Sequence, residues 1–147
     1  MQIVTNLDKE LVAKYYSRGS PILFEIYWEH EGVTYPDQGW TDFGIVVLGW
    51  WFYVVNEFRT GVSSSKFSFM DGPYAIEAAY NADTGSIELT PEDLGVTWHL
   101  SLQELVTGLI NSATQICQEL QEFGVAEQER LNLEKNIVQI KRNFGRV

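Results

Sequence analysis

The sequence predicts an α+β fold in which an antiparallel β-meander sheet carries a C-terminal pair of antiparallel helices on one face, with a short helix near the N-terminus. Three observations support this prediction. Short segments rich in β-branched and aromatic residues alternate with turn signals in the middle of the chain. Two long amphipathic segments follow residue 100, and a shorter one lies near the start. A length of 147 residues suits one domain, so residues 1–147 are expected to fold as a single domain.

The N-terminal helix is predicted over residues 7–17. Asn6 stands where an N-cap is needed, and Leu7 and Leu11 share one face of the helix. Gly19 supplies the stop signal. The next elements are two predicted strands, 22–28 and 33–35.

The segment from Phe43 to Val55 is apolar on both faces and is the hardest to assign. Its β-branched and aromatic residues predict a buried strand. One straight strand continuing to Phe58 would span about 50 Å, which is too long for a domain of this size. We therefore expect the strand to bend or break at Gly49. A helix after Gly49 is the alternative.

The middle of the chain has the pattern of a meander, because short strand-like segments alternate with turns that contain glycine, proline, asparagine or aspartate. The predicted strands are 66–70, 74–80, 86–89 and a short one at 96–99.

The first of the two C-terminal helices has the clearest local signals. Ser101 and Glu104 have the spacing of a capping box, and Gly124 is placed to end the helix. A last helix is predicted over residues 126–143. It carries glutamates in its first turn and Lys141 with Arg142 in its last, which suits the helix dipole.

Negative charge is concentrated in one part of the chain. The net charge is −10, and no lysine or arginine occurs between Lys66 and Arg130. Such a field repels nucleic acid phosphates and anionic lipids, and it attracts basic surfaces. The acidic residues of that stretch are Asp71, Glu77, Asp83, Glu88, Glu92, Asp93, Glu104, Glu119, Glu122, Glu127 and Glu129.

Residues with catalytic or ligand chemistry are few. Two histidines and the single Cys117 do not make a metal site, and Cys117 falls on the apolar stripe of a predicted helix. The chain has no glycine-rich phosphate loop and no nucleophile-elbow motif. We therefore expect no catalytic residue, cofactor or metal, and no enzymatic activity. The N-terminus lacks a secretory signal and no apolar run suits a membrane span, so a cytoplasmic location is expected.

Four segments give the sequence a family resemblance. They are Leu-Phe-Glu-Ile-Tyr-Trp at 23–28, Trp-Thr-Asp-Phe at 40–43, Trp-Trp at 50–51 and Phe-Met-Asp-Gly-Pro-Tyr at 69–74. Together with the two helices after Ser101, they resemble bacterial immunity proteins of contact-dependent inhibition and other polymorphic toxin systems. The resemblance implies a cytoplasmic protein that binds a cognate toxin domain and blocks its active site or substrate cleft. Many such toxins are basic nucleases, which an acidic inhibitor suits. The resemblance transfers no contact residue.

The partner-binding residues are therefore predicted from charge and placement. Acidic residues on predicted hairpins and loops are preferred, because binding residues concentrate there. A tryptophan in a loop between two aspartates is the best aromatic candidate. The predicted residues are Asp83, Glu88, Glu92, Asp93, Asp37, Trp40 and Asp42.

Two other classes of function stay open. A small-ligand-binding domain would use an aromatic-lined pocket that opens past Trp28, Trp40 or Trp98. A carboxylate enzyme would pair acidic residues for acid–base chemistry. The candidate pairs are Asp37 with Asp42 and Glu92 with Asp93.

Overall fold

A computed structural model describes residues 1–17 and 20–145, which form two four-stranded antiparallel sheets and four helices. The first sheet contains β1 (Gln2–Asn6), β2 (Phe24–His30), β3 (Val33–Tyr35) and β4 (Thr41–Asp42). The second contains β5 (Ser64–Ser68), β6 (Ala75–Asn81), β7 (Ser86–Pro91) and β8 (Trp98–Ser101), in that order. The helices are α1 (Lys9–Tyr15), α2 (Gly44–Arg59), α3 (Leu102–Phe123) and α4 (Glu127–Phe144).

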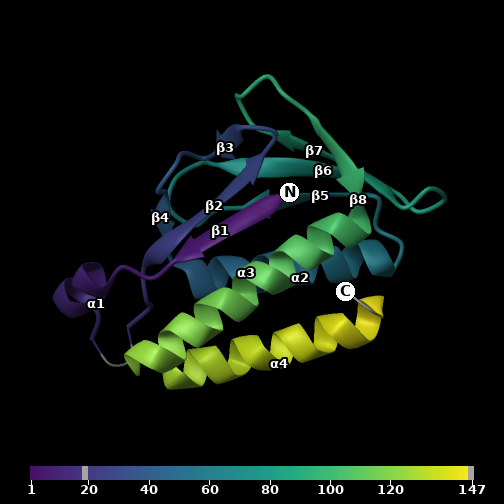
Figure 1. The fold of residues 1–147 in the computed structure, drawn as a ribbon. Coiled ribbons are helices and arrows are strands. Elements are labelled where there is room, and N and C mark those ends of the chain that lie inside the picture. Colours follow the sequence, from purple (N-terminus) through teal and green to yellow (C-terminus); the bar gives the residue numbers. More distant parts are fainter. Residues whose placement is uncertain (18–19, 146–147) are drawn as a thin grey trace.

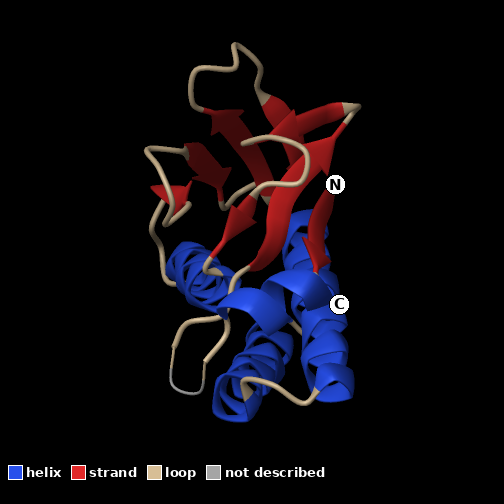
Figure 2. Ribbon diagram, turned by 90° about the vertical axis from the view of Figure 1, so that its left-hand side faces the viewer, coloured by secondary structure: helices blue, strands red, loops and turns tan. Residues whose placement is uncertain are grey.

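The predicted α+β class is confirmed, including the C-terminal helix pair and the short N-terminal helix. Figures 1 and 2 show the strands on one side of the molecule, with α2, α3 and α4 on the other. The strands form two sheets, whereas the sequence predicted one. Only β5–β8 form the meander, and β1, which was not predicted, pairs antiparallel with β2.

Residues 44–59 form the helix α2, so the predicted bent strand is wrong. The alternative, a helix after Gly49, had the correct type of element but began too late, because α2 runs through Gly49 from Gly44. An apolar run buried on most sides shows no periodicity that separates a strand from a helix. Intrinsic β-propensity is weak, and here packing against both sheets overrides it.

The core forms where α2 meets the two sheets. Trp28 on β2 contacts Trp51 on α2 at a ring-centroid distance of 5.2 Å and Phe67 on β5 at 5.1 Å. All three side chains are fully buried. Edge-to-face and tilted contacts of this kind favour ring pairs beyond the burial of their area. Trp28 therefore links the two sheets and α2.

The helix ends agree with the sequence where the signals are local. The Ser101 hydroxyl accepts a hydrogen bond from the Glu104 N–H at 3.0 Å, and Gly124 closes α3 with φ 74°. The N-cap of α1 is Asp8, whose carboxylate accepts from the Glu10 N–H at 2.9 Å. Asn6, the predicted cap, is instead the last residue of β1.

None of the helices in residues 1–17 and 20–145 combines the length and apolar character that crossing a bilayer requires.

Candidate protein-binding site

The outer face of the second sheet carries a row of carboxylates. Strand alternation buries Ile76, Ile87 and Leu89 and leaves Glu77 and Glu88 exposed on the opposite face. The register places Glu88 between Ala79 and His99, and Glu77 between Lys66 and Thr90. We call this surface the acidic sheet face, defined by Lys66, Glu77, Ala79, Glu88, Thr90, Glu92, Thr97 and His99.

Charge compensation on the acidic sheet face is partial. The Lys66 ammonium lies 3.3 Å from the Glu92 carboxylate and 3.8 Å from that of Glu77. His99 lies 3.6 Å from Glu88, with both side chains mostly exposed. Exposed pairs of this kind contribute little to stability. One lysine shared by two carboxylates therefore leaves the face with a net negative charge for a partner.

Four of the predicted site residues follow the course of β7. Asp83 is exposed in the hairpin loop before this strand, where its N–H donates to Asn81 at 3.0 Å. Glu88 lies in the middle of the strand, and Glu92 and Asp93 follow its end. The structure thus brings these four carboxylates to one strand and its two ends.

Asp42 holds two neighbouring loops together and is fully buried. Its carboxylate accepts hydrogen bonds from the Trp40 indole N–H at 3.1 Å and the Phe43 N–H at 2.7 Å. It also accepts from the main-chain N–H groups of Met70 and Asp71, each at 3.1 Å. A partner cannot reach this side chain. The prediction of Asp42 as a contact residue is therefore corrected, because the donors around it make it a positioning residue.

Trp40 is half-buried and packs edge-to-face against Tyr74 at a centroid distance of 5.0 Å. Gly72 adopts φ 100°, and a Cβ at this position would come within 3.0 Å of the Tyr74 ring. Asp37 is exposed on the same loop as Trp40. We call this cluster the aromatic corner, defined by Asp37, Trp40, Met70, Asp71 and Tyr74.

Met70 and Tyr74 were missed by sequence reasoning, although they are 47% and 38% exposed. The signal was the turn at 71–73, since residues flanking a tight turn are placed at the surface. Their proximity to Trp40 depends on the Asp42 contacts between distant loops, which no local pattern reveals.

Tyr35 connects the aromatic corner with the end of β7. Its ring packs against Tyr74 at 6.1 Å, and its hydroxyl oxygen accepts a hydrogen bond from the Ala75 N–H at 3.1 Å. Burial raises the pKa of Tyr35, and the negative charges of Glu92 and Asp93 raise it further. The corner and these two carboxylates therefore lie within electrostatic range of each other.

The other tryptophans predicted as pocket residues are in the core. Trp28 is 0% exposed and Trp98 is 3% exposed, so neither ring is presented to a ligand from outside. In the part of the chain that the structure describes, no group of three or more histidine, cysteine or acidic side chains is arranged to hold a metal ion.

No protein-family model matches the sequence, and no curated protein or solved structure matches it either. The function is therefore inferred from the surface of the protein.

Proposed function

We propose that this protein is a cytoplasmic immunity protein that binds and neutralises a basic toxin domain, such as a nuclease, by covering its active site or substrate cleft. The observation that carries the proposal is the placement of Glu88 on the exposed face of β7, with Asp83 in the loop before this strand and Glu92 and Asp93 after its end. Carboxylates arranged in this way can occupy positions that phosphates would take in a basic cleft. Long-range attraction would also speed the encounter.

The aromatic corner provides partly exposed aromatic side chains that could anchor a partner, which the acidic sheet face does not have. Affinity at interfaces is concentrated in a few aromatic and arginine anchors, and charges at the rim mainly affect the association rate. Trp40 and Tyr74 are fixed by their mutual contact and by the Asp42 hydrogen bonds, so little conformational entropy remains to be lost on binding. An arginine side chain of the partner would find an aromatic ring and a carboxylate together here.

The test is co-expression with the toxin domain encoded immediately upstream, followed by measurement of growth rescue and of binding kinetics with purified proteins. We expect rescue by the wild-type protein. The double variant Glu88→Lys/Glu92→Lys should associate about tenfold or more slowly at low salt, with a flatter salt dependence.

A matched control reverses two exposed charges elsewhere, in Glu122→Lys/Glu127→Lys, near the α3–α4 connection. It changes the net charge by the same amount, and it should retain most of the association rate. Absence of both binding and rescue for the wild-type protein would refute the proposal. An equal decrease of the association rate in both double variants would show that net charge causes the effect. The acidic sheet face would then not be the binding surface.

A further inference from the structure

β1 is an edge strand of the first sheet, and its outer side has no strand beside it in the described structure. The strand order is β1-β2-β3, with β4 also paired to β2. The Ile26 N–H donates to the Trp40 carbonyl, on the side away from β1. Successive residues of a strand direct their main-chain N–H and C=O groups to opposite sides. Glu25 and Tyr27, on either side of Ile26, therefore direct these groups toward β1.

The register then assigns the unpaired groups. Glu25 and Tyr27 lie opposite Asn6 and Val4, which form the hydrogen-bonded pairs. The alternate residues of β1, Ile3 and Thr5, therefore point their main-chain N–H and C=O groups away from β2, toward the unpaired edge. Their side chains are buried. An unpaired edge is a template for another extended chain.

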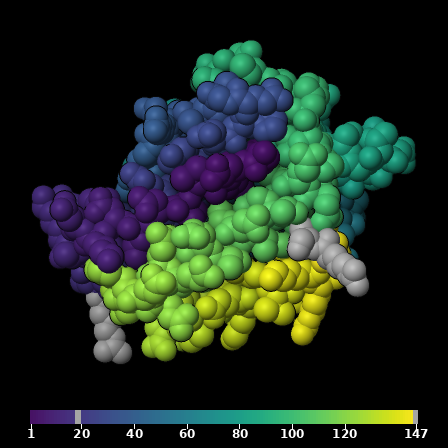
Figure 3. All heavy atoms as spheres, viewed as in Figure 1, coloured from purple at the N-terminus to yellow at the C-terminus, as the bar shows by residue number. Residues whose placement is uncertain are grey.

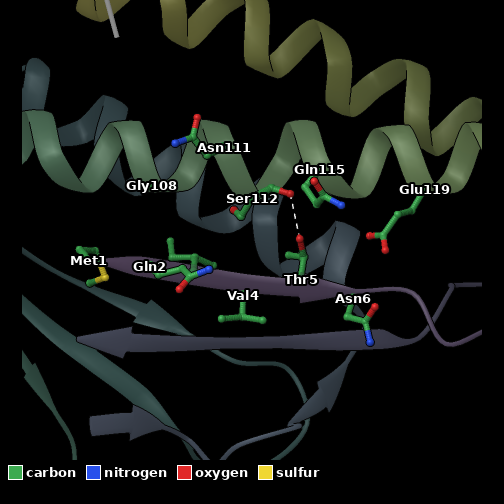
Figure 4. A pocket seen from close by; sticks show the side chains of 11 residues that line it. Met1, Gln2, Val4, Thr5, Asn6, Gly108, Asn111, Ser112, Gln115 and Glu119 are labelled. Carbon is green, nitrogen blue, oxygen red and sulfur yellow. Dashed lines mark hydrogen bonds between the residues drawn. The ribbon is translucent and has the colours of Figure 1, made fainter. Parts of the chain in front are cut away.

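A groove of about 420 Å³ runs along this edge, with α3 as its other wall. Figure 4 shows β1 and α3 as the two walls, and Figure 3 shows their surfaces side by side. The two walls are joined by the hydrogen bond from the buried Thr5 hydroxyl to the Ser112 carbonyl, at 3.0 Å. Gly108 of α3 faces Met1, and a Cβ at this position would lie 3.6 Å from the Met1 carbonyl oxygen, in ordinary van der Waals contact. The groove therefore has a strand edge on one side and helix side chains on the other.

The polar side chains that line the groove are mostly amides, with one carboxylate. Gln2, Asn111 and Gln115 contribute neutral donors and acceptors, and no lysine or arginine lines the groove. Glu119 accepts a hydrogen bond from the Leu7 N–H, while its Oε2 atom is buried without a partner. Glu119 carries the one charged side chain among the residues that line the groove, so a cation on a bound ligand would be attracted toward its carboxylate.

We propose that this groove binds an extended segment of a partner polypeptide that carries a lysine or arginine. The segment pairs its main chain with Ile3 and Thr5 as an added strand, and its cation reaches Glu119. Strand addition gives affinity through the main chain and selectivity through side-chain pockets. The site lies on the first sheet, apart from the acidic sheet face, and does not depend on toxin neutralisation.

The experiment titrates the full-length ¹⁵N-labelled protein with two acetylated heptapeptides, in which valine alternates with lysine or with glutamate. The lysine peptide should shift amide signals of β1 and of residues 108–119, and it should slow hydrogen exchange at Ile3 and Thr5. The glutamate peptide should bind at least about tenfold more weakly.

Variants locate the site. Glu119→Gln should weaken binding of the lysine peptide about tenfold and should not weaken binding of the glutamate peptide. Asn111→Trp, which fills the groove from α3, should abolish binding of the lysine peptide. Gln118→Ala, an exposed change on the same helix outside the groove, should have no effect.

Two results would overturn the groove proposal. The first is equal binding of the two peptides, and the second is a set of shifts confined to Glu77, Glu88 and Glu92. Either result leaves toxin neutralisation to its own test, since that test changes no residue of the groove.

Discussion

Asp42 and Trp40 are joined by a hydrogen bond of 3.1 Å from the indole N–H to a carboxylate that solvent does not reach. The same carboxylate accepts from the Met70 and Asp71 N–H groups, on a loop that lies beyond α2 in the sequence. One buried side chain therefore sets the position of both halves of the aromatic corner. The residues that a partner would touch depend on a residue that it cannot touch.

Replacing Asp42 by alanine should destabilise the protein by at least about 3 kcal/mol, because several buried N–H donors lose a charged acceptor together. Urea unfolding followed by tryptophan fluorescence measures the loss. The control is Asp37→Ala, on the same loop but exposed, which should change stability by less than about 0.5 kcal/mol. A similar small effect at both positions would contradict the positioning role of Asp42.

Two glycines of α2 should respond in opposite directions to alanine. A Cβ at Gly49 would meet no atom within 4 Å, so Gly49→Ala should stabilise the protein by about 0.5–1 kcal/mol through helix propensity. A Cβ at Gly44 would overlap the ring of Phe24, so Gly44→Ala should cost about 1–3 kcal/mol through overpacking. Thermal unfolding of the two variants measures both effects. If Gly49→Ala were clearly destabilising, residue 49 would not lie in a helix interior with open space around it.

Elements that are specified by residues close together in the sequence could be predicted, whereas those that depend on contacts between distant residues could not. The capping box of Ser101 and Glu104 and the stop at Gly124 are local, and both were predicted. The Asp83-containing hairpin was also predicted, since its turn residues are contiguous. The division into two sheets was not predicted, because strand pairing joins residues far apart in the sequence, such as Gln2 of β1 with Glu29 of β2.

The candidate site shows the same limit. Charge and loop placement selected Glu88, Glu92 and Asp93, which the fold does bring to one strand and its end. They also selected Asp42, because a loop aspartate beside a tryptophan has the same local sequence whether it is exposed or buried. Asp42 is buried because the main chain of Met70 and Asp71, which is distant in the sequence, packs against it and donates two hydrogen bonds to its carboxylate.

Glu119 should make stability depend on pH. Burial raises its pKa above the ordinary value of 4.5, with the Glu122 charge adding to the shift and the Leu7 N–H opposing it. The folded state therefore holds the proton more tightly than the unfolded state. This contribution to stability is fully present below the unfolded pKa and is lost as pH rises through the folded pKa.

Glu119→Gln removes the charge and keeps an acceptor for the Leu7 N–H. The variant should therefore gain stability relative to wild type between about pH 4 and pH 7. Urea unfolding at a series of pH values measures the difference. A difference for Glu119→Gln that stays constant, or that shrinks as pH rises, would contradict the raised pKa.

Cys117 should be nearly inert in the folded protein. Its side chain lies in the core contact between α3 and α4 and is 5% exposed. Burial raises the pKa of the thiol to about 11, with the Glu134 charge adding to the shift and Arg130 opposing it. Because the thiolate is the reactive form, only about one molecule in a thousand would be reactive at pH 8, even with free access. Labelling by an aromatic disulfide reagent should therefore be slow in buffer.

In urea, the labelling rate should rise in parallel with the unfolded fraction, since exposure of Cys117 requires separation of α3 from α4. The measurement is unambiguous because the chain contains one cysteine. Leu133→Ala, which removes a buried contact from α4, should destabilise the protein by about 2–4 kcal/mol and accelerate labelling correspondingly. Rapid stoichiometric labelling of the native wild-type protein would instead show that the helix pair opens independently of the sheets.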